Sequence, residues 1–302
     1  MISLKQLMYA LAVEQTLHFK KAAELCHVSQ SALSTAIIEL EKQIDMQLFE
    51  RNNKTVLVTE KGALFLIKAK AIKLALDELQ QISQFSKQPL SVPMAIGVIP
   101  TIGPYLLPKV LPKVRDLYPD FKLRLVEEQS HRLINMVKSG ELDAAVLALP
   151  YPIDGLLAFE FWQEDFYWVS HVDECQQHQQ EINSNELELD KLMLLKEGHC
   201  LKDQALAVCG NQSTAHNNAY DATSLYTLVQ MVAGKLGSTL VPKMALEQLV
   251  FQDKKLAAVH LHEPGPHRRI AFIIRPNYAG ADSIEVLIQL FTQQLSAQSQ
   301  ST

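Results

Sequence analysis

The sequence predicts an α+β chain of several domains: a small helical domain ending in a β-hairpin, a long helix, and a larger α/β part in two lobes. Three observations support this fold class. Apolar residues recur at helical spacing through the first 60 residues, a longer helical stretch with a heptad-like repeat follows, and strands alternate with helices from residue 94 onward. The length of 302 residues suits two to three domains of about 100–200 residues each.

The first domain is predicted to be mainly helical. Its apolar spacing predicts three short helices, at Leu4–Val13, Phe19–Cys26 and Gln30–Gln43. We expect Ala22, Ala23, Leu25 and Cys26 to face inward on the second helix, and Ser29 to cap the third. A short helix, a tight turn and a capped second helix are typical of a helix–turn–helix, which presents the first side chains of its second helix outward.

A hairpin and a long helix follow. Residues 48–51 and 56–58 flank a polar turn and predict a short hairpin. Thr59 can cap a helix over Glu60–Phe85, which ends at a proline-containing linker, 88–93. The apolar residues of this helix are spaced 7, 3, 4 and 3 positions apart: Phe65, Ile72, Ala75, Leu79 and Ile82. This spacing favours a dimerisation seam, and the alternative is a helix packed on its own domain.

The remaining chain is predicted to form two small α/β lobes with a crevice between them. We expect strands at Met94–Ile99, Lys122–Glu127, Asp143–Leu149, Leu192–Leu195, Ser238–Val241 and Ile270–Arg275. We expect helices at Pro104–Leu117, Ser130–Ser139, from Cys200 onward, at Ser224–Ala233 and at Ser283–Leu295. This alternation predicts mostly parallel sheets with helices on both faces, and a ligand site beyond the carboxyl ends of the strands.

Composition narrows the class of protein. The chain carries 28 basic and 33 acidic residues, but residues 1–90 hold eleven basic against nine acidic ones, a weak indication of a polyanionic partner for that part. No apolar stretch approaches the ~20 residues that cross a bilayer, and the start lacks a signal peptide, so we expect a cytoplasmic protein. Four cysteines without a C-x-x-C pair predict neither a disulfide framework nor a metal site. The sequence also lacks a phosphate-binding or dinucleotide-binding glycine motif, so we expect no cofactor.

The helix–turn–helix predicts a DNA-binding surface. Short polar side chains that can reach base edges and phosphates stand on or before the first turns of its second helix: Ser29, Gln30, Ser31, Ser34 and Thr35. Basic side chains are expected at the flanking phosphates: Lys20, Lys21, Arg51 and Lys54. By spacing alone, the alternative is a helical bundle with a solvated polar face.

The stretch FKKAAELCHVSQSALSTAIIELEKQIDMQLFERNNKTVLVTEKG resembles the winged helix–turn–helix of LysR-type transcription regulators. The matching frame runs from Ala22 to Gly62, and Ser31 stands where the family often has proline. The resemblance covers the whole chain and implies three parts: a DNA-binding domain at 1–59, a linker helix and hinge at 60–92, and an effector domain at 93–302 that is similar to periplasmic binding proteins. Its lobe I would span about 93–163 plus 269–302, and lobe II about 164–268. The resemblance also implies homodimers and homotetramers that bind promoter half-sites in double-stranded DNA and contact RNA polymerase.

A second motif, EGHCLKDQALAVC at 197–209, contains two cysteines nine residues apart. In one continuous helix, the α-carbons of Cys200 and Cys209 would lie ~13 Å apart on opposite faces. A disulfide requires about 7 Å or less, so the pair could bond only if the segment unwound. The spacing leaves two interpretations open: buried structural thiols, or a redox pair that acts as a conformational switch. The helix start and the neighbouring His199 and Lys202 favour an accessible thiolate of low pKa at Cys200.

The segment GHCLKDQA…C, together with IGVIPTIGPYLLPKVLP at 96–112 and EEQSHRL at 127–133, is similar to the peroxide-sensing LysR-type regulators. The resemblance implies that Cys200 reacts with hydrogen peroxide, that Cys209 resolves the product into a reversible disulfide, and that a cytosolic thiol reductant resets it. It further implies control of oxidative-stress genes and a peroxide pocket formed by Thr101, Ser130, His199, Lys202, Asp203 and either Arg268 or Arg269. Lys202 stands where the family commonly has arginine, and Ser130 where it commonly has threonine.

The sequence leaves two other functions open. A LysR-type regulator gated by a small molecule in the inter-lobe cleft would respond to its ligand without Cys200. A thiol peroxidase would turn over peroxide with a reductant and bind no specific DNA, and the DNA-binding motif argues against such an enzyme. Of the two remaining cysteines, Cys26 is expected in the core and Cys175, in a polar stretch, at the surface.

Overall fold

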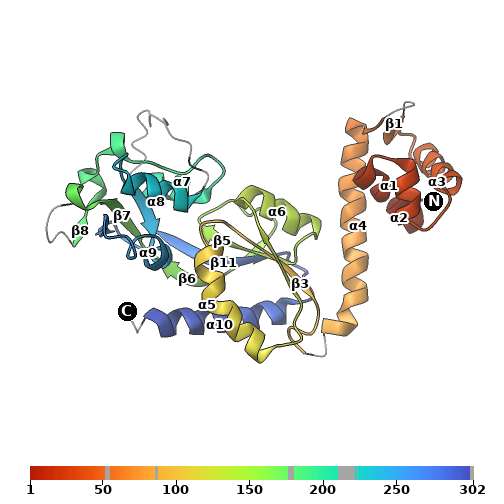
Figure 1. Ribbon diagram of the computed structural model, residues 1–302. Coiled ribbons are helices and arrows are strands. Elements are labelled where there is room, and N and C mark those ends of the chain that lie inside the picture. Colours follow the sequence, from red (N-terminus) through yellow and green to blue (C-terminus); the bar gives the residue numbers. More distant parts are fainter. Residues whose placement is uncertain (52–54, 86–87, 176–179, 210–221, 223, 300–302) are drawn as a thin grey trace. The chain divides into compact units, whose positions relative to one another are not determined.

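The computed structural model of the protein describes residues 1–302 except 52–54, 86–87, 176–179, 210–221, 223 and 300–302. The chain divides into two compact units, Met1–Ser83 and Gln84–Thr302 (Figure 1). None of the helices in the described ranges is long and apolar enough to cross a membrane. Each unit has its own hydrophobic core, and the two are described separately.

The first unit contains the three predicted helices, the hairpin and most of the long helix. The elements are α1 (Leu4–Thr16), α2 (Phe19–Leu25), α3 (Gln30–Gln43), β1 (Phe49–Arg51), β2 (Val56–Val58) and α4 (Glu60–Phe85). Ser29 caps α3 as predicted, because its side-chain oxygen accepts a hydrogen bond from the backbone N–H of Ala32 at 3.2 Å. Strands β1 and β2 pair antiparallel.

The expected inward face of α2 is partly wrong. This helix buries Phe19, Ala22 and Ala23, which lie at positions i, i+3 and i+4 of one face. Leu25 is 54% exposed because it lies six residues after Phe19, on the other side of a helix that has only two turns. Cys26 is half-buried and packs against the core of the unit.

The start of α4 is fixed by close contacts with the hairpin. The Thr59 hydroxyl accepts a hydrogen bond from Gly62 N–H at 2.8 Å and donates one to the Gln47 carbonyl at 2.7 Å. A β-carbon at Gly62 would lie only 2.3 Å from the Leu48 carbonyl oxygen, so the close approach of helix and hairpin requires glycine here.

One side of α4 packs on the first unit and another is exposed. Leu66 and Ala69 are buried. Of the predicted seam, Phe65 is half-buried against the core of the unit, Ile72, Ala75 and Leu79 are exposed, and the side chain of Ile82 lies outside the described residues. Leu64 and Ile67 add to the exposed apolar surface of this helix.

In the second unit, lobe I is a five-stranded sheet in the order β4-β3-β5-β11-β6. Its strands are β3 (Met94–Val98), β4 (Leu123–Glu127), β5 (Ala144–Leu149), β6 (Leu157–Glu164) and β11 (Arg268–Ile274). Strand β3 pairs parallel with β4 and β5, whereas β11 pairs antiparallel with β5 and β6. The helices of this lobe are α5 (Gly103–Leu117), α6 (Ser130–Ser139) and α10 (Ala281–Ser299) (Figure 1).

Lobe II contains a four-stranded sheet in the order β8-β10-β7-β9. Its strands are β7 (Phe166–His171), β8 (Glu181–Ile182), β9 (Thr239–Pro242) and β10 (Leu256–Leu261), and its helices are α7 (Cys200–Val208), α8 (Leu225–Ala233) and α9 (Lys243–Leu249). Strand β7 is antiparallel to β9 and β10, and β8 is parallel to β10. Three short 3-10 helices complete the described part of this lobe: η1 (Val172–Glu174), η2 (Ser184–Glu186) and η3 (Leu189–Lys191).

The prediction of mostly parallel sheets is wrong. Both sheets are mixed, because the chain crosses from lobe I to lobe II through β6 and β7 and returns through β10 and β11. Four strands of the two sheets were not predicted from the sequence: β6, β7, β8 and β10. The strand expected at Leu192–Leu195 contributes isolated bridges to Ser238 and Ala222 within the described residues, rather than a ladder.

Candidate functional site

The expected DNA-binding side chains of the first unit are mostly exposed. Ser29, Gln30, Ser31 and Thr35 are exposed at the start of α3, and Ser34 is half-buried. Lys20 and Lys21 are exposed in the first turn of α2. The side chain of Arg51 and all of Lys54 lie outside the described residues. Short polar side chains at the N-terminal end of an exposed helix have the size and chemistry that base edges in a major groove require.

Glu41 is a residue of this unit that the sequence analysis missed. Its Oε1 atom accepts hydrogen bonds from the backbone N–H groups of Leu48 at 2.8 Å and Phe49 at 3.2 Å. The carboxylate therefore ties the hairpin to α3 and sets the position of the two elements relative to each other. No sequence pattern around Glu41 indicates this role, because a glutamate in a helix is most often simply exposed to solvent.

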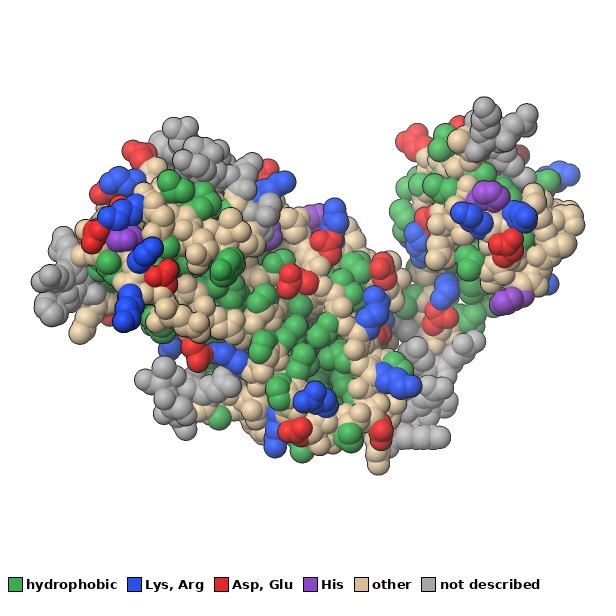
Figure 2. All heavy atoms as spheres, viewed as in Figure 1, with side chains coloured by type: hydrophobic (Ala, Val, Ile, Leu, Met, Phe, Trp, Pro, Cys, Tyr) green, Lys and Arg blue, Asp and Glu red, His purple; other side chains and the backbone are tan. Residues whose placement is uncertain are grey.

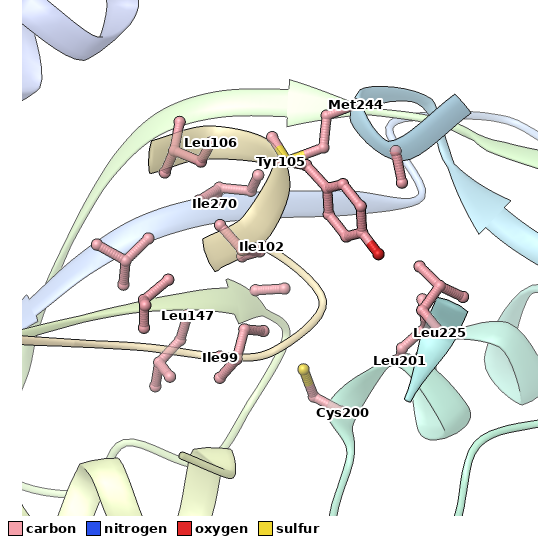
Figure 3. Packing of buried hydrophobic residues seen from close by; sticks show 14 of the residues in the cluster. Ile99, Ile102, Tyr105, Leu106, Leu147, Cys200, Leu201, Leu225, Met244 and Ile270 are labelled. Atoms are coloured by element: carbon pink, nitrogen blue, oxygen red, sulfur yellow. The ribbon is translucent and has the colours of Figure 1, made fainter. Parts of the chain in front are cut away.

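Cys200 is the first residue of α7 and is 3% exposed. Its thiol is directed toward the segment that carries Ile99 and Ile102, which connects β3 to α5 of lobe I (Figure 3). Tyr105, on α5, is another member of the same buried cluster. The thiol of a lobe II helix therefore lies against lobe I.

Arg268 is the charged side chain that lobe I provides near this thiol. It is fully buried, and its Nε and Nη2 atoms donate to Glu164 Oε1 at 2.7 and 2.6 Å. Nη2 also donates to the Thr101 carbonyl at 3.2 Å and Nη1 to the Thr101 hydroxyl at 3.4 Å. Arg269, the alternative left open by the sequence, points the other way: its side chain is 43% exposed and pairs with Glu160.

The surroundings of Cys200 shift the pKa of its thiol in both directions. Burial raises the pKa of the Cys200 thiol, and the charge of Asp203 adds to this effect. The Ser130 hydroxyl, the Arg268 guanidinium and the Ala148 backbone lower the pKa, but less than burial raises it. The expectation of an accessible thiolate of low pKa is therefore wrong for this arrangement, because a helix start inside a core loses more in solvation than it gains from its neighbours.

Ser130 is itself buried. Among the described residues, its hydroxyl forms no hydrogen bond within normal geometric limits, although it lies close enough to the Cys200 thiol to favour the thiolate. Thr101 is 2% exposed. Two buried hydroxyls and a buried guanidinium of lobe I thus lie near the thiol of Cys200, and all three are groups that can hydrogen-bond oxygen atoms.

His199 precedes Cys200 and is also buried. Burial lowers the pKa of His199, and Lys196 adds to the shift, so we expect a neutral imidazole at neutral pH. Its Nε2 lies 3.4 Å from Gln129 Nε2, at the start of α6. Gly198 has a φ of +93°, and a β-carbon there would lie 2.7 Å from Gln129 Oε1, so glycine is needed for this approach.

The other two expected pocket residues lie nearer the surface. Lys202 is half-buried, with Nζ 3.8 Å from Glu197, and Asp203 is exposed.

Gln204, which was not predicted from the sequence, is buried and donates from Nε2 to the Ala148 carbonyl at 3.1 Å. It lies one helical turn after Cys200, so the i, i+4 spacing was the signal that could have identified it.

Cys209 lies at the opposite end of α7, as its C-cap, and is also buried. Burial, with the charge of Glu263, raises the pKa of Cys209 to about 11. Cys26, Cys200 and Cys209 are free thiols, and the helix between Cys200 and Cys209 is continuous. Cys175 is half-buried rather than exposed, and burial raises its pKa.

No three His, Cys, Asp or Glu side chains in the described parts of the chain are grouped as metal ligands would be.

Comparison with protein families matches both units. The model described as the bacterial regulatory helix-turn-helix protein of the lysR family matches residues 4–63, and the LysR substrate binding domain matches residues 88–296.

Similar proteins and structures are named as regulators. The hydrogen peroxide-inducible genes activator of Dickeya chrysanthemi is 33% identical over 99% of this chain and 100% of its own length. The HTH-type transcriptional regulator EstR of Acinetobacter baylyi is 35% identical over 95% of each chain. A full-length OxyR variant of Pseudomonas aeruginosa superposes with a TM-score of 0.79 at 31% identity, covering 96% of this chain and 95% of that one. An H2O2-bound OxyR mutant of Corynebacterium glutamicum superposes with a TM-score of 0.66 at 30% identity, covering 98% and 93%.

Proposed function

Since the chain belongs to the LysR family of bacterial transcription regulators, we propose that it senses hydrogen peroxide through a reversible disulfide between Cys200 and Cys209. The observation that carries this proposal is the pair of buried thiols at the two ends of α7, one of which lies among Thr101, Ser130 and Arg268. Similar proteins named as peroxide-inducible activators support the choice of peroxide.

The first step is an attack of the Cys200 thiolate on one oxygen of the peroxide. The O–O bond breaks, Cys200 becomes a sulfenic acid, and the second oxygen leaves as hydroxide, which takes a proton to become water. Ser130 and Thr101 can hydrogen-bond the peroxide oxygens, and Arg268 stabilises both the thiolate and the departing hydroxide. We assign the neutral His199, with Lys202 and Asp203 at the outer side, to the same pocket.

The second step joins the two ends of α7. The Cys209 sulfur attacks the Cys200 sulfur, the S–O bond breaks, and the hydroxyl leaves with the thiol proton as water. The α-carbons at the ends of a nine-residue helical step are ~13 Å apart, whereas a disulfide needs about 7 Å or less. The helix must therefore unwind, and the bonds of Gln204 and Cys200 to Ala148 of lobe I are lost in the process. Reduction by a cytosolic thiol would restore the dithiol form.

The first unit would read promoter half-sites. The side chains at the start of α3 are proposed to contact base edges, and Lys20, Lys21, Arg51 and Lys54 the flanking phosphates. Unwinding α7 would change the contacts between lobes, and in an oligomer such a change can alter the spacing of the DNA-reading helices. Contact with RNA polymerase would then complete the control of transcription.

Two apolar surfaces support homodimers and homotetramers. The exposed residues of α4, including Ile72 and Leu79, form a stripe of the kind that a second helix would cover. On lobe I, a groove of about 510 Å³ lies along α5 and β4, and Figure 2 shows hydrophobic side chains gathered over this part of the face. Its lining is mainly apolar: Leu107, Pro108, Leu111, Pro112, Val114, Arg115, Tyr118, Phe121, Leu123 and Leu125. Contiguous apolar surfaces of this kind are typical of subunit interfaces.

Peptide mapping tests the proposal directly. The reduced protein is exposed for seconds to near-stoichiometric hydrogen peroxide and then digested without reductant. We expect a peptide that links Cys200 to Cys209, with Cys26 and Cys175 still free, and a different DNA footprint for each redox form. A Cys200 that remains a free thiol under conditions that oxidise model thiols would rule out peroxide sensing.

A ligand-gated regulator is the second candidate, and one cavity favours it. The cavity has a volume of about 340 Å³, lies where the two lobes meet, and is lined by residues of both: Lys109, Trp162, Glu164, Tyr167, Lys243, Met244, Leu246, Glu247, Phe251 and Leu295. If such a ligand gates the protein, replacing Cys200 by serine would leave the response of the DNA footprint to that ligand intact.

A further inference from the structure

The cavity where the two lobes meet is joined to the thiol site by a chain of hydrogen bonds. Glu164 lines the cavity from β6, and its Oε2 atom accepts a hydrogen bond from the Met244 N–H of α9 at 2.7 Å. Its Oε1 atom is bound by Arg268, whose two Nη atoms also donate to the hydroxyl and carbonyl oxygens of Thr101. All four residues are buried, and Met244 and Cys200 belong to one buried cluster (Figure 3). A change at α9 can therefore reach the thiol site through direct contacts.

The walls of this cavity come from both lobes. Lobe I contributes residues of α5, β6 and α10, and lobe II contributes residues of β7 and α9 together with Phe251. One ion pair, Lys109 Nζ to Glu247 Oε2 at 3.2 Å, joins α5 to α9. The Lys243 N–H donates at 3.0 Å to the carbonyl of Asp165, the residue that connects β6 to β7. A molecule that filled the cavity would thus contact both lobes at the place where the chain crosses between them.

The shape and the apolar lining indicate a small molecule with an aromatic body. The volume of about 340 Å³ lies within the range of about 300 to 1,000 Å³ that small-molecule sites occupy. The rings of Trp162, Tyr167 and Phe251 offer flat apolar surface, and Leu246 and Leu295 add aliphatic side chains. Aromatic ligands pack well against such rings, in stacked or edge-to-face arrangements.

The charged groups of the cavity leave one positive charge unbalanced. Glu164 is paired with Arg268, and Lys109 is paired with Glu247. Lys243 is exposed, and no carboxylate of the described residues forms an ion pair with it. A ligand with a single negative charge would give this lysine a partner while its apolar part lies against the rings.

We propose that this cavity is an effector site for a small aromatic carboxylate, which stabilises the reduced arrangement of the lobes and so opposes formation of the Cys200–Cys209 disulfide. The inference rests on the proposed function, because it concerns the control of that disulfide. Unwinding of α7 removes the hydrogen bond from Gln204 to Ala148 of lobe I, so the oxidised protein loses a contact that fixes the lobes around the cavity. A ligand that binds the reduced form more tightly shifts the redox equilibrium toward the dithiol. Such a ligand acts on the switch, whereas the ligand of a ligand-gated regulator would act in place of it.

Calorimetry and tryptophan fluorescence test the site. The reduced full-length protein is titrated with phenylacetate and with 3-phenylpropanoate, and calorimetry gives the affinity. The chain has two tryptophans, of which Trp162 lines the cavity and Trp168 does not. We expect ligand binding to change the emission of the wild-type protein and of Trp168→Phe, and to leave the emission of Trp162→Phe unchanged.

A neutral ligand and two lysine variants test the charge. 2-Phenylethanol, which has the ring of phenylacetate without its charge, should bind the wild-type protein about 3- to 5-fold more weakly, as the loss of an exposed ion pair predicts. Lys243→Gln should bind both ligands equally. The matched control is Lys254→Gln, which removes an exposed lysine of lobe II outside the cavity and should keep the preference for phenylacetate.

Redox titration tests the coupling between the cavity and the thiols. The wild-type protein is equilibrated in glutathione buffers of graded composition, with and without saturating phenylacetate, and the linked peptide is quantified. We expect phenylacetate to lower the equilibrium constant for disulfide formation about 5-fold, the lower end of typical couplings between two sites. Because such a coupling is reciprocal, the oxidised protein should bind phenylacetate more weakly by the same factor.

Several results would overturn the inference. Absence of binding of both carboxylates at millimolar concentrations, or binding that leaves the emission of Trp162 unchanged, would remove the site. Equal affinities for phenylacetate and 2-phenylethanol would remove the carboxylate, and equal affinities of the reduced and oxidised protein would remove the coupling. The proposed function fails in a different way, through the absence of a linked peptide in peroxide-treated protein without ligand. The titrations of the reduced protein do not depend on that result.

Discussion

The two units place their candidate functional residues in opposite environments. In the first unit, they are short polar and basic side chains on exposed turns of α2 and α3, outside the core. In the second, Cys200, Thr101, Ser130 and Arg268 are all buried and belong to the packed interior between two lobes. Apart from the α3 cap Ser29, the candidate DNA-binding side chains can therefore change with little loss of stability, whereas the candidate thiol site is part of the core that holds it.

This difference predicts how substitutions should behave. An exposed site residue should affect binding and leave the free energy of unfolding nearly unchanged, except for Ser29, which also caps α3. A buried site residue should affect both chemistry and stability, because it also satisfies the polar groups around it. The following substitutions and conditions test the contrast, beginning with the largest expected effect.

Cys200→Ser should abolish the switch completely. A serine hydroxyl cannot form the sulfenic acid or the disulfide, so the DNA footprint should no longer change with peroxide, while the first unit still binds DNA. Footprinting of the variant with and without peroxide measures this. Cys175→Ser is the matched control, and its footprint should respond as in the wild-type protein. A peroxide response that persists in Cys200→Ser would transfer sensing to another site.

Arg268→Met should destabilise the second unit by about 3–5 kcal/mol, because the buried Glu164 carboxylate would lose its positively charged partner and keep only the hydrogen bond from the Met244 N–H. The neighbouring ion pair of Arg269 with Glu160 is largely exposed, so Arg269→Met should cost no more than about 1 kcal/mol. Urea unfolding of both variants gives the comparison. Equal costs for the two arginines would show that the buried position confers no special stability.

The rate of Cys200 oxidation should rise with pH. Because burial raises the pKa of the thiol, only a small fraction is thiolate at neutral pH, and this fraction grows about tenfold per pH unit below the pKa. Quenched-flow measurement of the linked peptide between pH 6 and pH 8 would follow this rise. A rate independent of pH over that range would mean that Ser130 and Arg268 outweigh burial and that the thiolate is already formed.

The same contrast explains which features could be predicted from the sequence. The helices of the first unit depend on local signals, such as the Ser29 cap and the spacing of Leu33, Ile37 and Leu40, and they form as predicted. The sheet of lobe II depends on pairings between β7 and β10, whose residues lie about 90 positions apart in the chain. A local pattern contains no information on such a partner, so the mixed character of both sheets escaped the sequence analysis.

The candidate site, like the fold, could be predicted only in part from the sequence. The cysteine motif and the resemblance to peroxide-sensing regulators identified side chains that the structure brings together, such as Thr101 and Arg268. The sequence alone could not show whether Arg268 or Arg269 lies near the thiol. Adjacent residues of a strand face opposite sides of the sheet, and the register of β11 was unknown. The pKa of Cys200 was also misjudged, because desolvation depends on the depth of burial and not on sequence neighbours.

Ser29→Ala tests stability in the first unit. Loss of the cap of α3 should cost about 1 kcal/mol, since the N–H of Ala32 loses its acceptor. Thermal unfolding followed by circular dichroism gives the cost. Ser31→Ala, two residues later, serves as the control because the Ser31 hydroxyl contacts the Ser29 hydroxyl and caps no N–H among the described residues. Similar losses in the two variants would mean that the cap is not what stabilises the helix.

Lys21→Gln should have the smallest effect and gives the sharpest test of the exposed surface. If Lys21 contacts a phosphate, the slope of log affinity against log salt should decrease in magnitude by about 0.9, since one counterion fewer is released on binding. The free energy of unfolding should stay within about 0.5 kcal/mol of the wild-type value, because the side chain is exposed. Lys138→Gln, an exposed lysine of α6 in lobe I, should change neither quantity. An unchanged salt slope in Lys21→Gln would remove this residue from the DNA interface, whereas a change in stability would show that the first unit, like the second, builds its binding residues into its fold.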